Sequence, residues 1–253
     1  MTSTWRRPVL YVGTIGFVLA VWELLSVTGM VQPLLLASPG DTWDRLVLLT
    51  GQGGTVRSAV EVTLRETGTA FLIASAVAVP FGVLAGASRT ARAAYEPLLT
   101  SFSALPLVVL YPVLAATIGI GSGSKIALAA LYTFFPIVIG TLRATANVDV
   151  GLLAAARTMG ATRSQQTLSV VSPTVFPAVL SSMRVGLGLG LVTTIAAEFI
   201  SGAEGVGYQL GVTSQGLDTP GLFAWIVIAC ALTVVVNVIF TLCTIVARKG
   251  VYR

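Results

Sequence analysis

Long apolar runs, separated by shorter polar segments, occupy most of this chain. Six of the runs are bounded by glycine, proline or charged residues, and crossing a hydrocarbon core of about 30 Å takes about 20 mostly apolar residues. The predicted membrane spans are residues 9–28, 63–88, 97–118, 124–143, 173–200 and 221–247. The pattern therefore predicts an all-α polytopic membrane protein with about six transmembrane helices, in which residues 1–253 form one transmembrane domain.

Two connections between the predicted spans carry structure of their own. Residues 28–62 join the first two spans as an extracytoplasmic connection, and the stretch Leu34 to Gly54 within it mixes charged and apolar positions as a short helix on the membrane surface does. Residues 147–166 join the fourth and fifth spans and form the longest internal loop on the cytoplasmic side.

Glycines and prolines inside the predicted spans have structural explanations. Two pairs of glycines are spaced four residues apart, as in helices that approach one another closely: Gly82 with Gly86, and Gly186 with Gly190. Prolines recur at Pro80, Pro106, Pro112, Pro136 and Pro177. Each proline removes a helical hydrogen bond, which membrane helices tolerate, so we expect ordinary irregularity at these positions.

Composition and charge agree with a membrane protein. Of the 253 residues, 55% are hydrophobic and 10% are charged, which is more apolar than a soluble domain of this length requires. The net charge of +5 does not indicate a nucleic-acid partner, because the basic residues are scattered between apolar runs. A cytoplasmic N-terminus and C-terminus place ten of the 15 basic residues inside, as the positive-inside rule expects. These are Arg6, Arg7, Arg89, Arg92, Arg143, Arg157, Arg163, Arg248, Lys249 and Arg253.

The residue types needed for a catalytic or metal site are largely missing. The chain has no histidine, and its two cysteines, Cys230 and Cys243, lie about 20 Å apart on one predicted helix, too far for a disulfide. An integral-membrane enzyme would need clustered ligands or a nucleophile beside a base, and the predicted spans offer neither. We therefore expect a chain without catalytic activity that binds no cofactor or metal.

The cytoplasmic loop contains local signals for two short helices. Asp149 is placed to cap a helix that begins at Val150, and Gly160 is placed to end it in a left-handed conformation. The sequence from Thr162 to Gln165 matches a capping box and predicts a second start, so the chain turns sharply at Gly160.

The apolar positions of the first short helix leave two interpretations open. Leu152, Ala156 and Met159 are spaced to share one face, with Leu153 beside them. So short a helix is not stable alone in water. This face either packs back on the membrane domain of the same chain or inserts into a groove of a cytoplasmic protein.

The loop resembles the EAA loop of ABC-transporter permeases. Ala155 and Ala156 match the two alanines of that pattern, Gly160 its glycine and Pro173 its proline, whereas Ala154 stands where the family usually has glutamate. The resemblance implies that this loop couples the permease to an ATPase. The coupling residues that it implies are Leu152, Leu153, Ala155, Ala156, Arg157, Met159, Gly160, Ala161 and Pro173.

Further segments are similar to the permeases that import nitrate, sulfonate, taurine and bicarbonate. They are GIGSGSK from Gly119, FFPIVIGTLRA from Phe134, and AEFISGAEGVGYQL from Ala197. The resemblance implies a permease subunit of an ATP-driven importer for a small anionic solute, working by alternating access. Because the same group includes importers that resemble those for thiamine precursors and aromatic carboxylates, these solutes remain alternatives.

The resemblance also implies partners for this chain. GIGSGSK lacks the ending that an ATP-binding loop needs, so ATP and magnesium are expected on a separate ABC ATPase dimer. The other partners implied are a second permease copy, identical or similar, and an extracytoplasmic substrate-binding protein. The location implied is the cytoplasmic (inner) membrane of a bacterium.

Two charged residues inside the fifth span are candidates for the translocation pathway or its gate. Arg184 either faces the pathway and attracts an anion, or bonds to carbonyls freed by Pro173 or Pro177. Glu198 is expected near the outer end, as a gate or a packing anchor. A secondary transporter is the alternative from another class, but it should show paired intramembrane acids or two related halves, which are not evident here.

Overall fold

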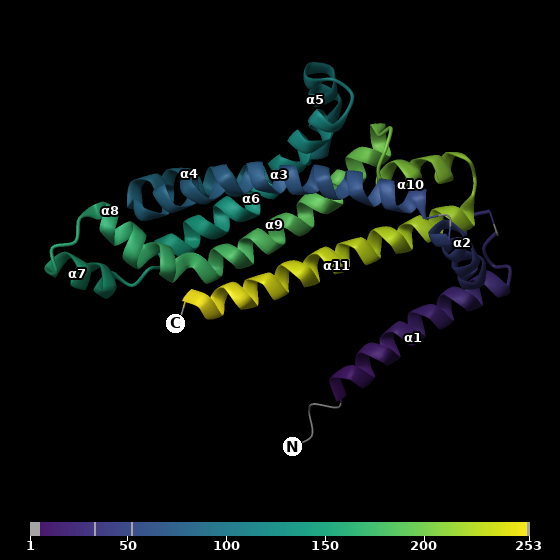
Figure 1. The fold of residues 1–253 in the computed structure, drawn as a ribbon, viewed down its shortest axis with the longest axis horizontal. Coiled ribbons are helices and arrows are strands. Elements are labelled where there is room, and N and C mark those ends of the chain that lie inside the picture. Colours follow the sequence, from purple (N-terminus) through teal and green to yellow (C-terminus); the bar gives the residue numbers. More distant parts are fainter. Residues whose placement is uncertain (1–5, 33, 52, 252–253) are drawn as a thin grey trace.

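The computed structural model describes residues 6–32, 34–51 and 53–251, and within these ranges the regular elements are helical (Figure 1). In chain order they are α1 (Arg6–Val27), α2 (Pro39–Gly51), α3 (Gly54–Ala87), α4 (Arg89–Ser103), the 3₁₀ turn η1 (Leu107–Leu110), α5 (Tyr111–Ile118), α6 (Ser122–Ala146), α7 (Val150–Thr158), α8 (Arg163–Gln166), the π-helical turn η2 (Thr167–Val171), α9 (Ser172–Ser201), α10 (Val206–Gln215) and α11 (Thr219–Val251). The predicted all-α class is confirmed. Of the residues discussed for the positive-inside rule, Arg253 lies outside the described residues.

Helices occupy the positions of all six predicted spans. Among the described residues, four helical runs are long and apolar enough to cross a membrane: Gly54–Ala87, Ser122–Ala146, Arg163–Ser201 and Thr219–Ala247. A bent pair, α4 with η1 and α5, makes a fifth if it is counted as one span. The apolar part of α1 described as Gly13–Val27 is shorter than these. The chain is thus a multi-pass membrane protein.

The third predicted span, 97–118, is not one continuous helix. α4 ends at Ser103, helical structure resumes at Leu107, and the two parts are bent by 78°. Pro106 explains the break, because proline has no N–H to donate and disfavours helical geometry at the residue before it, Leu105. As a result α5 projects from the bundle instead of continuing along it (Figure 1).

The centre of the bundle is α6, which packs between α3 and α9 at two pairs of glycines. A Cβ atom added at Gly82 of α3 would lie 2.7 Å from Thr141 Cβ, and one at Gly86 would lie 2.5 Å from the Leu142 carbonyl oxygen. On the other side, a Cβ atom at Gly186 of α9 would lie 2.8 Å from Ile137 Cγ1. These distances are shorter than ordinary contacts between nonbonded atoms. The packing role predicted for the glycines is therefore confirmed.

The two amino-terminal helices are attached at one end of the bundle. The Trp22 ring of α1 stacks on Phe223 of α11 at a centroid distance of 5.6 Å, and its Nε1–H donates to the Ala37 carbonyl at 2.9 Å. Arg45 of α2, the predicted surface helix, forms an ion pair of 2.6 Å with Asp218 just before α11. Away from this attachment α1 diverges from α11 (Figure 1).

The two long connections lie at opposite ends of the bundle. α7, α8 and the carboxyl end of α11 gather at one end, whereas α2 and α10 lie at the other (Figure 1). α3 begins already at Gly54, before the predicted start of the second span at 63, so Arg57, Glu61 and Arg65 lie on this helix.

Candidate functional site

The short helix α7 is fixed at both of its ends by local hydrogen bonds. At its start the Asp149 carboxylate accepts a hydrogen bond of 2.7 Å from the Gly151 N–H. At its end Gly160 has φ +80°, and its N–H donates to the Arg157 carbonyl at 2.9 Å, while the Ala161 N–H donates to the Ala156 carbonyl at 3.0 Å. This pair of bonds is a Schellman motif, which requires a left-handed residue at the position of Gly160. Both caps predicted from the sequence are confirmed.

The turn after α7 is closed by the predicted capping box. The Gln165 side chain accepts from the Thr162 N–H at 2.8 Å, and the Thr162 hydroxyl accepts from the Gln165 N–H at 3.4 Å. Gln166 is buried, donates to the Ala161 carbonyl at 2.8 Å and accepts from Arg157 Nε at 3.4 Å. Arg157 and Ala161 therefore help to hold α7 against α8.

The apolar residues of α7 divide between an inner and an outer face. Leu153 packs against a cluster of four buried valines, Val148, Val171, Val175 and Val179, and Ala156 is half-buried. On the outer side Val150 is 77% exposed, Leu152 48% and Met159 87%, and Ala155 is exposed as well. One face of α7 therefore packs back on the membrane domain, as one interpretation predicted, whereas the other face remains uncovered, and its insertion into a cytoplasmic protein stays a prediction.

Helical structure runs without a break from α8 through η2 into α9, 39 residues from Arg163 to Ser201. The π-helical turn η2 precedes Pro173, which lies in the first turn of α9 and is exposed. Within this turn the Ser172 N–H donates to the Thr167 carbonyl, five residues earlier, as in a π-helix. The chain that follows α7 is thus continuous, through α8 and η2, with the membrane helix α9.

Arg184 lies at a cavity between α9 and α11. The side chain is exposed, and the cavity has a volume of about 730 Å³. Its polar lining comes from Ser181 and Arg184 on α9 and from Thr233, Asn237, Thr241 and Thr244 on α11. The sequence had drawn attention to Arg184 alone, and the structure adds the polar face of α11 beside it.

Glu198 is fully buried and joins three helices. The Thr63 hydroxyl of α3 lies 2.8 Å and 2.9 Å from the two carboxylate oxygens, and the Gly207 N–H donates to Oε2 at 2.8 Å. The Val206 N–H donates to the Thr63 hydroxyl at 3.0 Å. Val206 and Gly207 are the first residues of α10, so their otherwise unpaired amides are capped by side chains of α3 and α9. These contacts are those of a packing anchor.

A second buried charge was missed from the sequence. Lys125 of α6 lies 2.7 Å from Oε1 of Glu66 on α3, and the two side chains are 4% and 0% exposed. The sequence pattern places Lys125 only within the GIGSGSK segment and indicates no role for Glu66. The signal was an acidic residue within an apolar helix, on the same face as Thr63 and Ala70, in a chain with only two lysines. Arg184 lies at the cavity between α9 and α11, whereas Glu198 lies where α3, α9 and α10 meet, so the structure does not bring the two predicted residues together.

Comparison with known proteins relates this architecture to transporters. A chain of the MetNI methionine ABC transporter, solved in an inward-facing conformation, has the same fold with a TM-score of 0.64 and 21% identity, over 78% of this chain and 96% of that chain. The taurine transport system permease TauC of Escherichia coli (strain K12) is 29% identical over 88% of this chain and 85% of its own length. The aliphatic sulfonates transport permease SsuC of Bacillus subtilis (strain 168), itself named as putative, is 28% identical over 83% of this chain and 76% of its own.

The family follows from a match to a sequence profile that covers most of the bundle. The sequence profile described as "Binding-protein-dependent transport system inner membrane component" matches residues 78–249, from within α3 to the last turn of α11. The permease resemblance inferred from the loop is confirmed. This chain belongs to the binding-protein-dependent transport system inner membrane components, as a permease, and not an enzyme, of an ABC importer system.

Proposed function

We propose that this chain forms the membrane passage of an ATP-driven importer in the bacterial cytoplasmic membrane. Its solute is a small anion, such as nitrate, bicarbonate, a sulfonate like taurine, or a small organic acid, and transport proceeds by alternating access. The names of two relatives, which refer to taurine transport for TauC and to aliphatic sulfonate transport for SsuC, support this solute class.

One observation carries the proposal, namely the exposed apolar face of a helix that is rigid at both ends. Val150, Leu152 and Met159 are exposed on α7, although a free apolar face is unfavourable in water. We assign this face to a cleft of the ABC ATPase, which holds ATP and magnesium. The caps at Asp149 and Gly160 prevent α7 from unwinding when the ATPase moves.

The inner face of α7 supplies the route by which such a movement reaches the membrane. Leu153 contacts the valine cluster, two members of which, Val175 and Val179, belong to α9. Because α8, η2 and α9 are continuous, a displacement of α7 is transmitted along α9 toward Arg184. Closure of two ATPases on ATP would then move two permease copies, identical or similar, between two arrangements.

The cavity beside Arg184 is the best site for the solute path. An arginine in a membrane helix is costly, at least about 2.5 kcal/mol on insertion scales, and such residues mark polar pathways. Arg184 stands opposite the hydroxyl and amide groups of Thr233, Asn237 and Thr241, which suit a hydrated anion better than lipid. We propose that this face borders the passage.

The arrangement of the two ends fits the proposed orientation. With α7 in the cytoplasm, the carboxyl end of α11 lies on the cytoplasmic side, and α2 and α10 face outward (Figure 1). The outer end is then the surface that receives the substrate-binding protein. This orientation agrees with the sequence expectation that residues 28–62 are extracytoplasmic and residues 147–166 are cytoplasmic.

The proposal is tested by uptake into proteoliposomes that contain the chain, its ATPase and its binding protein. Taurine, an alkanesulfonate, nitrate and bicarbonate are compared with a thiamine precursor and an aromatic carboxylate. We expect ATP-dependent uptake of an anion, reduced at least tenfold by Arg184→Gln and retained by Arg65→Gln, which removes an exposed arginine of α3. Uptake without ATPase, or uptake that is insensitive to Arg184→Gln, would contradict it.

A further inference from the structure

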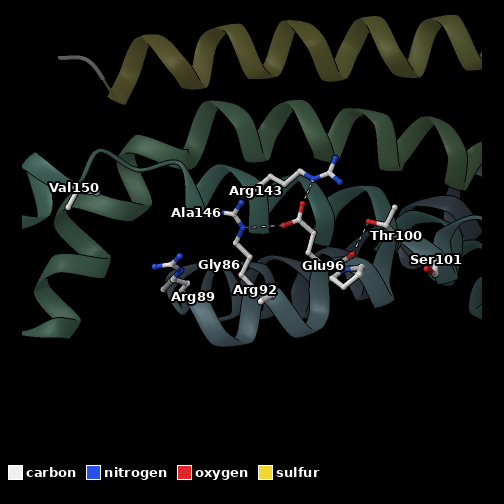
Figure 2. Close-up of a pocket in the computed structure, with 12 residues that line it drawn as sticks. Gly86, Arg89, Arg92, Glu96, Thr100, Ser101, Arg143, Ala146 and Val150 are labelled. Atoms are coloured by element: carbon white, nitrogen blue, oxygen red, sulfur yellow. Dashed lines mark hydrogen bonds and ion pairs between the residues drawn. The ribbon is translucent and has the colours of Figure 1, made fainter.

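A basic cavity lies between α4 and α6, close to the start of α7. Its volume is about 1090 Å³, and its charged lining is Arg89, Arg92 and Glu96 from α4 and Arg143 from α6. Val150, the first residue of α7, lies at its edge. Figure 2 shows the side chains of Arg92, Glu96 and Arg143 gathered between the two helices, with Arg89 to one side of them at the start of α4. With three arginines and one carboxylate, the lining carries a net positive charge.

Glu96 accepts hydrogen bonds from only some of the guanidinium donors of these arginines. Its Oε1 accepts from Arg143 Nε at 2.8 Å, and its Oε2 accepts from Arg92 Nε at 3.2 Å. Both arginines donate through Nε, and in Figure 2 their terminal amino groups point away from the carboxylate. Arg89 takes part in no ion pair among the residues that the structure describes. Several guanidinium donors therefore remain available to the cavity.

We infer that this cavity binds an oxyanion group, a phosphate or sulfonate, between Arg89, Arg92 and Arg143. Guanidinium groups bind such groups in bidentate fashion, and the bonds are charge-assisted. The cavity has room for more than an inorganic ion. Under the proposed orientation it opens at the cytoplasmic level, so the group belongs either to an anionic lipid headgroup or to a soluble anion in the cytoplasm.

Glu96 acts in this arrangement as an internal competitor. An incoming oxyanion takes over the donors of Arg92 and Arg143 and weakens their bonds to the carboxylate. Arg143 lies in the last turn of α6, immediately before the segment that leads to α7. Occupancy of the cavity therefore changes the contact between α4 and α6 beside the proposed coupling helix. The binding step itself requires neither ATP nor transport.

The test measures binding to the purified full-length chain, without ATPase or binding protein. One arm titrates taurine and inorganic phosphate calorimetrically at constant chloride. The other compares nanodiscs of phosphatidylcholine with and without phosphatidylglycerol, and measures phosphatidylglycerol retained on the chain by native mass spectrometry. Binding in either arm supports the site and names its source when the substitutions in the cavity weaken it, because the separate cavity at Arg184 is also proposed to accept small anions. Because transport is not measured, failure of the proposed function and failure of this site are distinguishable.

The substitutions are expected to change the affinity for the oxyanion in opposite directions. Arg92→Gln with Arg143→Gln should weaken binding at least tenfold, and Arg89→Gln, which breaks no ion pair, should weaken it without affecting folding. Glu96→Gln should strengthen binding severalfold, because the competitor loses its charge. Arg163→Gln, an exposed arginine of α8 outside the cavity, is the control and should change nothing. Absence of binding in both arms, or weaker binding in Glu96→Gln, would overturn the inference.

Discussion

Lys125 Nζ of α6 lies 2.7 Å from Glu66 Oε1 of α3, and both side chains are withdrawn from the surface. The two residues are far apart in the sequence, and they meet because glycines bring α3 and α6 into close contact further along the same pair of helices. A buried ion pair of this kind is costly to break, because the remaining charge is left without a partner.

We predict that Lys125→Met strongly destabilises the protein. Removal of one partner of a buried ion pair typically costs about 3–5 kcal/mol, whereas replacement of both by neutral groups is often tolerated. Glu66→Gln combined with Lys125→Met should therefore recover most of the loss. Thermal unfolding of the detergent-solubilised chain measures both variants. A single variant as stable as the parent would show that the pair contributes nothing.

Gly205→Ala should destabilise the junction of α3, α9 and α10. Gly205 has φ +108°, and a Cβ atom there would collide with the Glu198 carboxylate. Gly68→Ala is the matched control, since nothing lies within 4 Å of its added Cβ atom and alanine favours a helix by about 0.5–1 kcal/mol. Thermal unfolding should shift downward for the first variant and not for the second. Equal shifts would argue against the close contact.

The two faces of α7 should respond differently to serine. Leu153→Ser removes a contact with the valine cluster and should cost stability by about 1–3 kcal/mol. Met159→Ser changes a side chain that is 87% exposed and should alter stability by less than about 0.5 kcal/mol, yet reduce copurification of the ATPase. The comparison requires unfolding curves and a pull-down from the same preparations. Full ATPase recovery with Met159→Ser would place the docking face elsewhere.

Gly160→Val should separate ATP hydrolysis from transport. A β-branched residue at φ +80° is strained by about 1–2 kcal/mol, so the Schellman motif opens and α7 no longer moves as a rigid helix. Gly160→Asn is the control, because asparagine tolerates this conformation. Membrane insertion should be normal for both, and solute uptake per ATP hydrolysed should fall only for valine. Normal uptake by the valine variant would count against α7 as the coupling element.

The parts of the structure that the sequence predicts well depend on local interactions. The ends of α7 follow from Asp149 and Gly160, and the next turn follows from Thr162 and Gln165, because each cap is made by residues within a few positions of one another. Glycine spacing within single helices likewise predicted the close approach of helices at the two glycine pairs, although not that α6 is the partner of both. In these cases the residues that determine the structure are neighbours in the chain.

The features that were missed depend on distant residues. Pro106 breaks a helix whereas Pro80, Pro136 and Pro177 lie inside continuous ones, so a proline within an apolar run does not by itself tell where a helix ends. The start of α10 has no capping signal in the glycine-rich stretch before it. The first amides of this helix are capped instead by Thr63 and Glu198, which belong to other helices. The contact between Glu66 and Lys125 likewise depends on how each helix is oriented about its own axis, which the sequence alone does not determine.

The capping of α10 by two other helices limits how this end of the protein can deform. To lift α10 alone, a carboxylate, a hydroxyl and two backbone donors would have to lose their partners together, far from water. α3, α9 and α10 therefore form one stiff block, fastened at a single polar joint. Under the proposed function, solute is then admitted at this end by movements that keep α3, α9 and α10 together, and a cross-link between α3 and α10 should leave uptake unhindered.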